Sequence, residues 1–406
     1  MKLTKEISEK NYKAFLWHAV FLSIAMNFMD IDTIVPSMLI KAGGSSLHIG
    51  IMTAILLGGS SFSQIFFSLF IQNQSKKKPF LIMGINVRII SLLSLGLLFI
   101  ITSGKSGSIM WWIFFFIILF SFSGAFSNIS YIDILGKSIL SEKRKRFFSL
   151  NQTIRSVAIF LTVFIVRYII NNVNFPANYS MLLIIAGISL FIGSIGFWRI
   201  NEFDSISLKI SGFKNFFRKM SDEIKNNRRV LHYLFIINTL GVGLSIPPFL
   251  LLFAKESFGA NVSIVGNLLL FKTIGLILAG FIMFKLSSII KYGKILYFSF
   301  YLALSLPFIA FFLKDLVGFY PFVFFISGVF STLFRVTKSG ILLEISTNSN
   351  RSLYAGLSGS GNILTMVFPF IGGLMISKVG FIPFFILYIV VILLSYKAIS
   401  GLRCKK

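Results

Sequence analysis

Two aspartates interrupt an apolar run near the start of the chain. The run extends from about Ala14 to Ile40, and its stretch NFMDIDTIVP contains Asp30 and Asp32. A carboxylate is costly inside hydrocarbon, so an ionisable side chain in such a run is a candidate functional residue. The chemistry open to it is uptake and release of a proton, or an ion pair that holds two helices together.

Helical geometry separates the two aspartates, because residues two positions apart point about 200° away from each other. Asp32 falls on an apolar face, near the outer end of the run and four residues before Pro36. A helical proline leaves the carbonyl of residue 32 without its hydrogen bond, so a kink there would let Asp32 reach water. We expect Asp30 to face a cavity, since it shares a polar stripe with Ser23, Asn27 and Ser37.

Basic side chains also lie inside apolar runs. A cavity with an excess of cations attracts anions, so an anionic or zwitterionic solute is expected. The alternative is structural, because Arg88 and Arg155 stand about two turns from the run ends and could snorkel or brace helices. The predicted proton and substrate cavity comprises Asp30, Asn27, Arg88, Asn151, Arg155, Lys272, Arg335 and Lys338.

The composition identifies the solvent around these charges. The chain has 406 residues, of which 56% are hydrophobic and 13% charged, whereas about 25% charged residues is usual in soluble domains. Runs of about 20 apolar residues span a bilayer. We predict an all-α polytopic membrane protein with about twelve spans, at 14–40, 47–71, 80–103, 109–136, 147–170, 179–200, 230–254, 262–284, 295–313, 319–345, 353–377 and 381–398.

The distribution of positive charge predicts the orientation. Most of the 39 Lys and Arg residues lie in the terminal tails and in every second break between spans. Positive charge in short loops marks the cytoplasmic side, so both termini are expected there. The net charge of +26 is explained in this way, and no nucleic-acid partner is expected.

The chain divides into two halves of six spans. The predicted domains are 1–200, a basic cytoplasmic linker at 201–229, and 230–406 with a short tail. The stretches RKRFFSLNQ and RSLYAGLSG follow the fourth and tenth spans, at equivalent places in the two halves. An acid ends the preceding span in each half, Asp133 or Glu344. A duplicated six-helix unit is therefore favoured.

Two motifs carry a family resemblance. The loop SLFIQNQSKKK, residues 68–78, keeps the basic end of the sequence G-x-x-x-D-[RK]-x-G-[RK]-[RK], with Ser68, Gln72 and Ser75 in place of Gly, Asp and Gly. PFIGG, residues 369–373, is similar to a P-x-x-G-G element. With the six-plus-six organisation, these features resemble the major facilitator superfamily (MFS). A Gly-Pro pair of the antiporter type is missing from 147–170, which argues against a drug/proton antiporter.

The resemblance implies a secondary transporter that works by alternating access. It also implies that acids at the inner span ends pair with loop arginines and close the cytoplasmic side. The predicted cytoplasmic gate is Asp133, Arg144, Glu344 and Arg351. The segment GVGLSIPP, residues 241–248, has two glycines followed by two prolines, and it is expected either to bend or to allow close helix packing.

The sequence favours one of three classes of function. A proton-coupled transporter of a small solute is favoured, as a monomeric multi-pass protein of the inner (plasma) membrane, with the lipid bilayer as its surroundings. The alternative is a protein of the same fold without transport activity, such as an assembly factor or a sensor. An intramembrane enzyme is disfavoured, because the sequence contains no HExxH, GxSxG or GxxxxGK[ST] motif, and no cofactor or metal site is expected.

Overall fold

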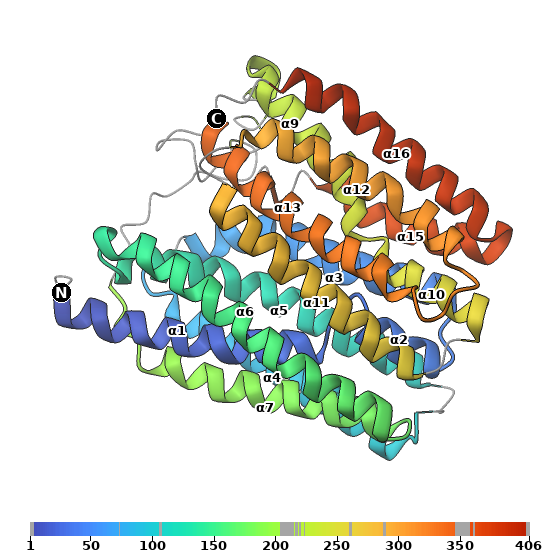
Figure 1. The fold of residues 1–406 in the computed structure, drawn as a ribbon. Helices are drawn as coiled ribbons and strands as arrows, with labels where there is room; N and C mark the ends of the chain where they lie inside the picture. The colour runs from blue at the N-terminus through green and yellow to red at the C-terminus, as the bar shows by residue number, and fades with distance from the viewer. Residues whose placement is uncertain are drawn as a thin grey trace. The chain divides into compact units, whose positions relative to one another are not determined.

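Helices are the regular secondary structure in the part of the chain that the structure describes, as predicted. The computed structural model describes residues 4–72, 74–104, 108–203, 215, 218, 221–222, 224–259, 262–286, 290–345, 358–359 and 362–402. Figure 1 labels the helices along the chain. They are α1 Lys5–Phe28, α2 Ile34–Lys41, α3 Ser46–Gln72, α4 Lys78–Ile101, α5 Ile109–Ser138, α6 Ser141–Asn172, α7 Ala177–Trp198, α9 Arg228–Thr239, the 3₁₀ helix η1 Leu240–Leu244, α10 Pro247–Phe258, α11 Val262–Leu286, α12 Tyr292–Phe312, α13 Pro321–Ile345, α15 Ile363–Val379 and α16 Phe381–Gly401.

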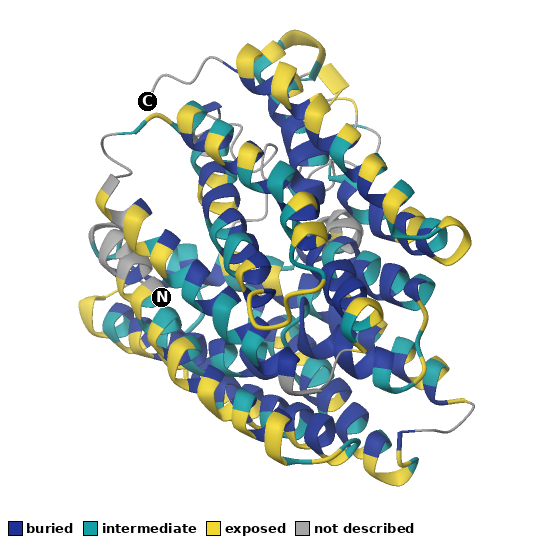
Figure 2. Cartoon of the chain, turned by 45° about the vertical axis from the view of Figure 1, so that its right-hand side comes forward, coloured by how far each residue is buried: buried dark blue, intermediate teal, exposed yellow. Residues whose placement is uncertain are grey.

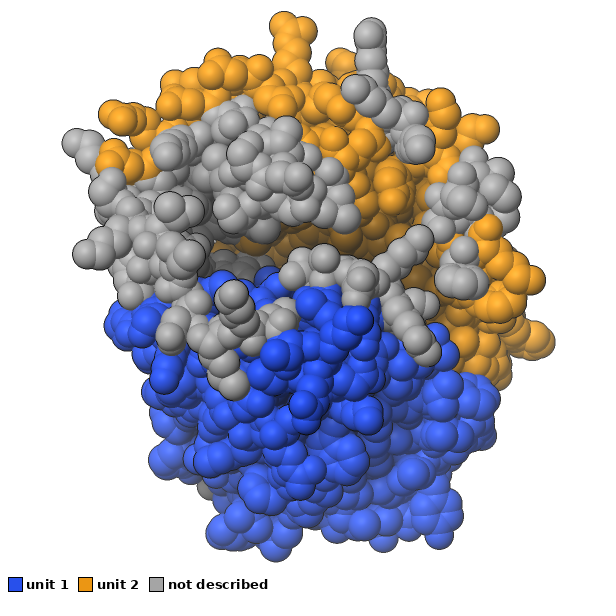
Figure 3. Space-filling view, turned by 90° about the vertical axis from the view of Figure 1, so that its left-hand side faces the viewer, with its two compact units in different colours: residues 1–30, 62–211 blue, residues 31–61, 212–406 orange. Residues whose placement is uncertain are grey.

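The helices fall into two compact units, coloured separately in Figure 3. The N-terminal unit comprises residues 1–30 and 62–211, and the C-terminal unit comprises residues 31–61 and 212–406. This division differs in two places from the domains expected from the sequence, and one of them is the predicted linker 201–229, which is shared between the units. Residues 31–61, which hold α2 and the first half of α3, group with the second half of the chain.

Within the N-terminal unit, α1 packs against α6 and α7, and α4 packs against α5 and α7. Small residues bring these helices close together. A Cβ atom at Gly196 would lie 2.6 Å from the carbonyl oxygen of Ala14, and one at Gly84 would lie 2.2 Å from Ser127 Oγ. The α1–α7 and α4–α5 contacts therefore depend on glycine, as is common where helices pack inside membranes.

Within the C-terminal unit, α11 and α13 form the most extensive helix pair, and α12 packs against α13 and α16. The short helix α2 packs against α10 and α11. The residues just before α2 belong to the same unit, and Asp32 there contacts Lys272 of α11, a helix that is far away in the sequence.

The first apolar run, expected over 14–40 with a kink near Pro36, is broken into two helices. Helix α1 ends at Phe28, residues 29–33 are not helical, and α2 begins at Ile34. Pro36 explains the position of the break. Its ring would clash with the carbonyl of residue 32 in a continuous helix, but it is accepted in the first turn of a new one.

The seventh run is broken in the equivalent place of the second half, within the segment expected either to bend or to allow close helix packing. Helix α9 ends at Thr239, η1 covers Leu240–Leu244, and α10 begins at Pro247. Both prolines of this segment lie at the start of α10, where a missing N–H group costs nothing. Each half of the chain therefore begins with an interrupted helix.

Large apolar side chains cover the helix faces that point outward. In Figure 2 the exposed residues, in yellow, run along single faces of the helices, and dark blue buried residues lie on the opposite faces. Exposed residues include Ile101 and Trp111, each 81% exposed, and Phe312, 79% exposed. Such surface is unfavourable in water but suits hydrocarbon. Among the described residues, nine helices are long and apolar enough to cross a membrane, so this is a multi-pass membrane protein.

Candidate functional site

A cavity of about 170 Å³ lies inside the N-terminal unit. Four helices contribute to its wall: α1, α4, α5 and α6. Three of the residues predicted for the cavity, Arg88, Asn151 and Arg155, do meet here although they come from different helices. The full lining is His18, Ala19, Leu22, Leu81, Ile85, Arg88, Gly124, Ser127, Asn128, Tyr131, Asn151 and Arg155.

Arg88 has unusual surroundings for a guanidinium group. Its Cζ lies 4.2 Å from the centre of the Phe120 ring, and its Nη2 lies 3.6 Å from the sulfur of Met26. Its Nε is buried and has no hydrogen-bond partner. Among the described residues no carboxylate forms an ion pair with it, so a cation–π contact is its main electrostatic compensation.

His18 lies near the boundary of the first predicted span, where its position in the sequence favours a packing role, and it also lines this cavity. Its side chain is buried, its ring centre lies 4.0 Å from that of Phe197, and its Nδ1 has no hydrogen-bond partner. The ring therefore packs as expected but also reaches the cavity. One signal in the sequence pointed to it: His18 lies seven residues after the polar Asn11, on the same face of α1.

Arg155 and Asn27 tie α6 to α1. Arg155 Nε donates to Ser23 Oγ over 3.3 Å, and Asn27 Nδ2 donates to Thr162 Oγ1 over 2.8 Å. Asn27 is buried and is not among the residues that line this cavity, so its place in a substrate cavity stays a prediction. Its amide joins two helices, so this part of the polar stripe along α1 serves helix packing.

A buried ion pair lies inside the C-terminal unit. Asp32 Oδ2 is 2.6 Å from Lys272 Nζ, and the two side chains are 9% and 6% exposed. Asp32 lies in the break between α1 and α2, and Lys272 lies in α11. Asp32 was expected on an apolar helix face with access to water, but it is buried. Helical spacing does not apply to it, because α1 ends at Phe28 and α2 begins at Ile34. A lone lysine in the eighth span needs a carboxylate partner, and that was the available signal.

The other predicted cavity residues have different surroundings. Asp30 is half-buried in the same break as Asp32. On α13, Arg335 is exposed and Lys338 is half-buried, whereas Ser327 and Ser331, which share a helix face with them by sequence spacing, are buried. Asp30, Lys272, Arg335 and Lys338 are not among the residues that line the cavity of the N-terminal unit.

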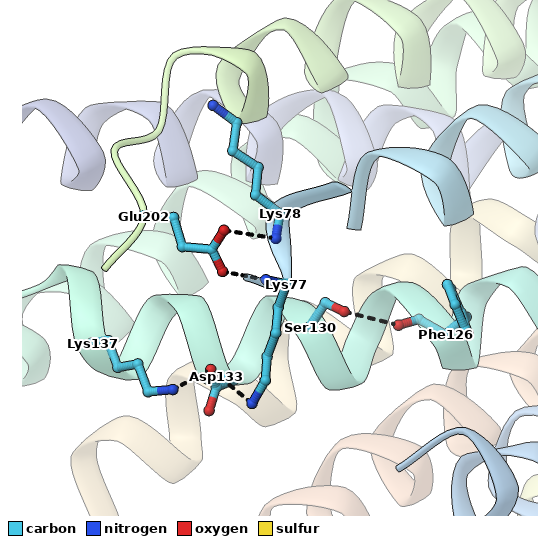
Figure 4. Close-up of polar contacts among 7 residues, drawn as sticks. All are labelled: Lys77, Lys78, Phe126, Ser130, Asp133, Lys137 and Glu202. Carbon is cyan, nitrogen blue, oxygen red and sulfur yellow. Dashed lines mark hydrogen bonds and ion pairs between the residues drawn. The ribbon is translucent and has the colours of Figure 1, made fainter. Parts of the chain in front are cut away.

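The acid at the end of α5 holds two lysines. Figure 4 shows Lys77 and Lys137 on either side of Asp133, whose Oδ2 lies 3.1 Å and 2.6 Å from their Nζ atoms. Nearby, the carboxylate of Glu202 accepts hydrogen bonds from the backbone N–H groups of Lys77 and Lys78 at the start of α4. A carboxylate at this position satisfies free backbone donors and complements the helix dipole.

We expect Asp133→Asn to lower the free energy of unfolding by about 1–3 kcal/mol, because the buried ammonium of Lys77 loses its counter-charge. Thermal unfolding in detergent measures this. Glu6→Gln, which changes an exposed acid of the same unit, is the control. Equal stability of the two variants would show that the contact between Asp133 and Lys77 does not stabilise the folded protein.

The two acids of the predicted gate, Asp133 and Glu344, have partners within the described residues. Glu344 of α13 pairs with Arg229 of α9, with 2.6 Å between Oε1 and Nη2. Asp133 pairs with Lys77 and Lys137. The Glu344 pair lies within the C-terminal unit, and the Asp133 pairs lie within the N-terminal unit. Arg351 and the side chain of Arg144 lie outside the described residues, so their gate role stays a prediction.

Neither a protein-family model nor a curated protein sequence matches this chain. Solved structures do match it over almost its whole length. A POT family transporter in complex with a thioalcohol-conjugated peptide is 10% identical, with a TM-score of 0.71 and coverage of 97% of this chain and 96% of that chain. The nucleoside transporter NupG is 14% identical, with a TM-score of 0.63 and coverage of 97% and 98%.

A third match has a recorded conformational state. It is a bacterial homolog of the human lysosomal transporter Spinster, in an inward-facing and unoccupied conformation. It is 12% identical, with a TM-score of 0.62 and coverage of 98% of this chain and 95% of that chain. At these identities the agreement establishes the fold, while the choice of solute depends on side chains that the fold does not fix.

Proposed function

We propose that this chain, which has the fold of the MFS transporters, is a secondary transporter that carries a small solute by alternating access in exchange for, or together with, protons. Three features support the proposal: the similarity to transporters over the whole chain, the apolar outer surface, and ionisable groups buried in the helices. We count α1–α2 and α9–α10 as one crossing each, which gives six crossings per half and twelve in total.

The observation that carries the proposal is the Asp32–Lys272 pair at a helix break. A buried ion pair is strongly held while both partners are charged, and it loses its attraction once the carboxylate takes up a proton. The same break leaves backbone groups outside regular helical bonding, where a small rearrangement is inexpensive. Interrupted helices commonly form substrate and ion sites in secondary transporters. We assign the coupling role to Asp32, in place of Asp30.

The proposed membrane location and orientation rest on the distribution of positive charge and on the apolar outer surface. We propose a multi-pass inner-membrane protein with both termini in the cytoplasm, since positive charge is concentrated in the breaks on that side.

The solute is proposed to be anionic or zwitterionic, because two arginines line the cavity of the N-terminal unit. Nucleosides and peptides are the solutes named for the structural neighbours, which supports a small polar molecule as the class.

The test uses purified protein in liposomes that enclose a pH-sensitive dye. We expect pooled anionic and zwitterionic metabolites to drive proton movement with the native chain, and we expect Asp32→Asn to reduce it at least about tenfold, the effect of removing one essential proton carrier. Asp30→Asn tests Asp30, the proton-binding carboxylate predicted from the sequence. Asp315→Asn, at an exposed position, is the matched control.

A second assay separates coupling from folding. The double variant Asp32→Asn with Lys272→Met removes both charges, so it should fold and still exchange labelled solute across the membrane without proton movement. Undiminished proton movement in Asp32→Asn would overturn the coupling role. If the native chain catalysed neither proton movement nor solute exchange, the alternative of a non-transporting protein with this fold would be favoured.

A further inference from the structure

We infer that the cavity of the N-terminal unit binds a small hydroxylated oxyanion, and that Arg88 holds its negative charge. The inference rests on the proposed transport function and narrows its solute class, from anionic or zwitterionic to anionic. Four observations carry it: the charges of the lining, the hydrogen-bonding groups without partners, the cavity volume, and the space that Gly124 leaves beside the guanidinium.

The lining is positively charged and contains no acid. Arg88 and Arg155 both contribute to it, and the remaining residues are neutral or, for His18, titratable. Arg155 is in contact with Ser23, whereas the electrostatic partners of Arg88 among the described residues are one ring and one sulfur. A cation with so little compensation is unfavourable for folding. Its place in a cavity is explained if an anion completes the site.

Unpartnered polar atoms define what the ligand must offer. Three buried atoms in this lining have no hydrogen-bond partner: Arg88 Nε, His18 Nδ1 and Asn151 Oδ1. The arginine nitrogen is a donor and requires an acceptor such as a carboxylate or phosphate oxygen. The amide oxygen of Asn151 is an acceptor and requires a hydroxyl. A hydroxycarboxylate or hydrogen phosphate supplies both groups in one small molecule.

The volume limits the ligand's size. The cavity has a volume of about 170 Å³. This is below the ~300–1,000 Å³ typical of sites for drug-sized ligands. A zwitterion of similar size is disfavoured for a separate reason, because its ammonium group would meet arginines and no carboxylate.

The first experiment measures binding by the purified protein in detergent, without any membrane. Thermal unfolding is recorded with lactate, propanoate, inorganic phosphate or glycine at constant ionic strength. We expect lactate or phosphate to raise the melting temperature of the native chain, propanoate to raise it less, and glycine to have no effect. A larger response to lactate identifies a carboxylate ligand, and a larger response to phosphate identifies a phosphate. No response to either anion would overturn the inference.

The Arg88→Gln variant tests the role of the charge. It removes a cation that has little compensation, so the empty protein should be at least as stable as the native one. Its affinity for the anion should fall on the order of 10- to 100-fold, as expected when a charge-assisted hydrogen bond is lost. A merely structural arginine would give the opposite pattern, with lower stability and unchanged anion affinity.

Gly124 provides a test that keeps every charge. A Cβ atom there would lie 3.6 Å from Arg88 Nε and 3.7 Å from its Cζ, an ordinary contact that fills space beside the guanidinium. Gly136→Ala is the matched control on the same helix, because its Cβ would meet nothing within 4 Å. We expect Gly124→Ala to weaken anion binding at least about fivefold, an effect the size of a small steric change, and Gly136→Ala to leave it unchanged.

The two proposals fail in different ways. Anion binding without transport in liposomes would keep the site and overturn the transport function. Transport of solutes by a native chain that binds none of these anions would keep the function and overturn the anion site. Equal anion affinity of Gly124→Ala and Gly136→Ala would also overturn the placement of the ligand beside Arg88.

Discussion

Replacing Lys272 with methionine is expected to lower the free energy of unfolding by about 3–5 kcal/mol. The substitution leaves the carboxylate of Asp32, 9% exposed, without the ammonium group that lies 2.6 Å away. Removing one partner of a buried pair has this magnitude because the remaining charge is no longer compensated. Unfolding of the purified protein, followed by its helical circular dichroism, measures the change.

The double variant Asp32→Asn with Lys272→Met distinguishes a lost ion pair from a lost contact. Removing both charges of a buried pair is often neutral, so most of the lost stability should return. Lys378→Met is the control, since Lys378 is exposed in the same unit. If the double variant were no more stable than Lys272→Met alone, the damage would come from packing around residue 272 and not from its charge.

The second large effect is expected where α11 and α13 touch. A Cβ atom at Gly328 would lie 2.2 Å from the carbonyl oxygen of Lys272, and one at Gly275 would lie 2.2 Å from that of Phe325. Backbone atoms cannot move aside as a flexible side chain would. We therefore expect Gly328→Ala to destabilise the protein by about 3 kcal/mol, at the upper end for overpacking.

A control on the same helix pair makes this prediction specific. At Gly280 of α11 an added Cβ would meet nothing within 4 Å. Gly280→Ala should therefore gain up to about 1 kcal/mol, because alanine favours a helix over glycine. Thermal unfolding of the two variants in the same detergent measures the difference. A Gly328→Ala protein as stable as Gly280→Ala would show that the two backbones are farther apart than the structure places them.

Because Gly328 lies against the carbonyl of Lys272, this contact also positions the ion pair. Forcing α11 away from α13 would move Lys272 relative to Asp32. We expect Gly328→Ala to impair proton movement as well as stability, whereas Gly280→Ala should leave both intact.

The sequence by itself determined the class of protein and much of the fold. Long apolar runs can satisfy their backbone hydrogen bonds in lipid only as helices, so hydropathy was sufficient to predict a helical membrane protein. The bend at Leu240–Leu244 followed from local glycine and proline chemistry. Arg88, Asn151 and Arg155 were identified because each is a polar group in an apolar run, and such groups face the interior of the bundle.

The tertiary structure decided which of these groups meet. Helical periodicity fixes the residues that share a face of one helix, but it does not indicate which helix lies opposite. Lys272 and Asp32, or Glu344 and Arg229, are far apart in the sequence, and only packing brought them together. The break at residues 29–33 also ended the regular spacing on which the choice of Asp30 depended, so Asp32 entered the C-terminal unit and met the lysine of α11.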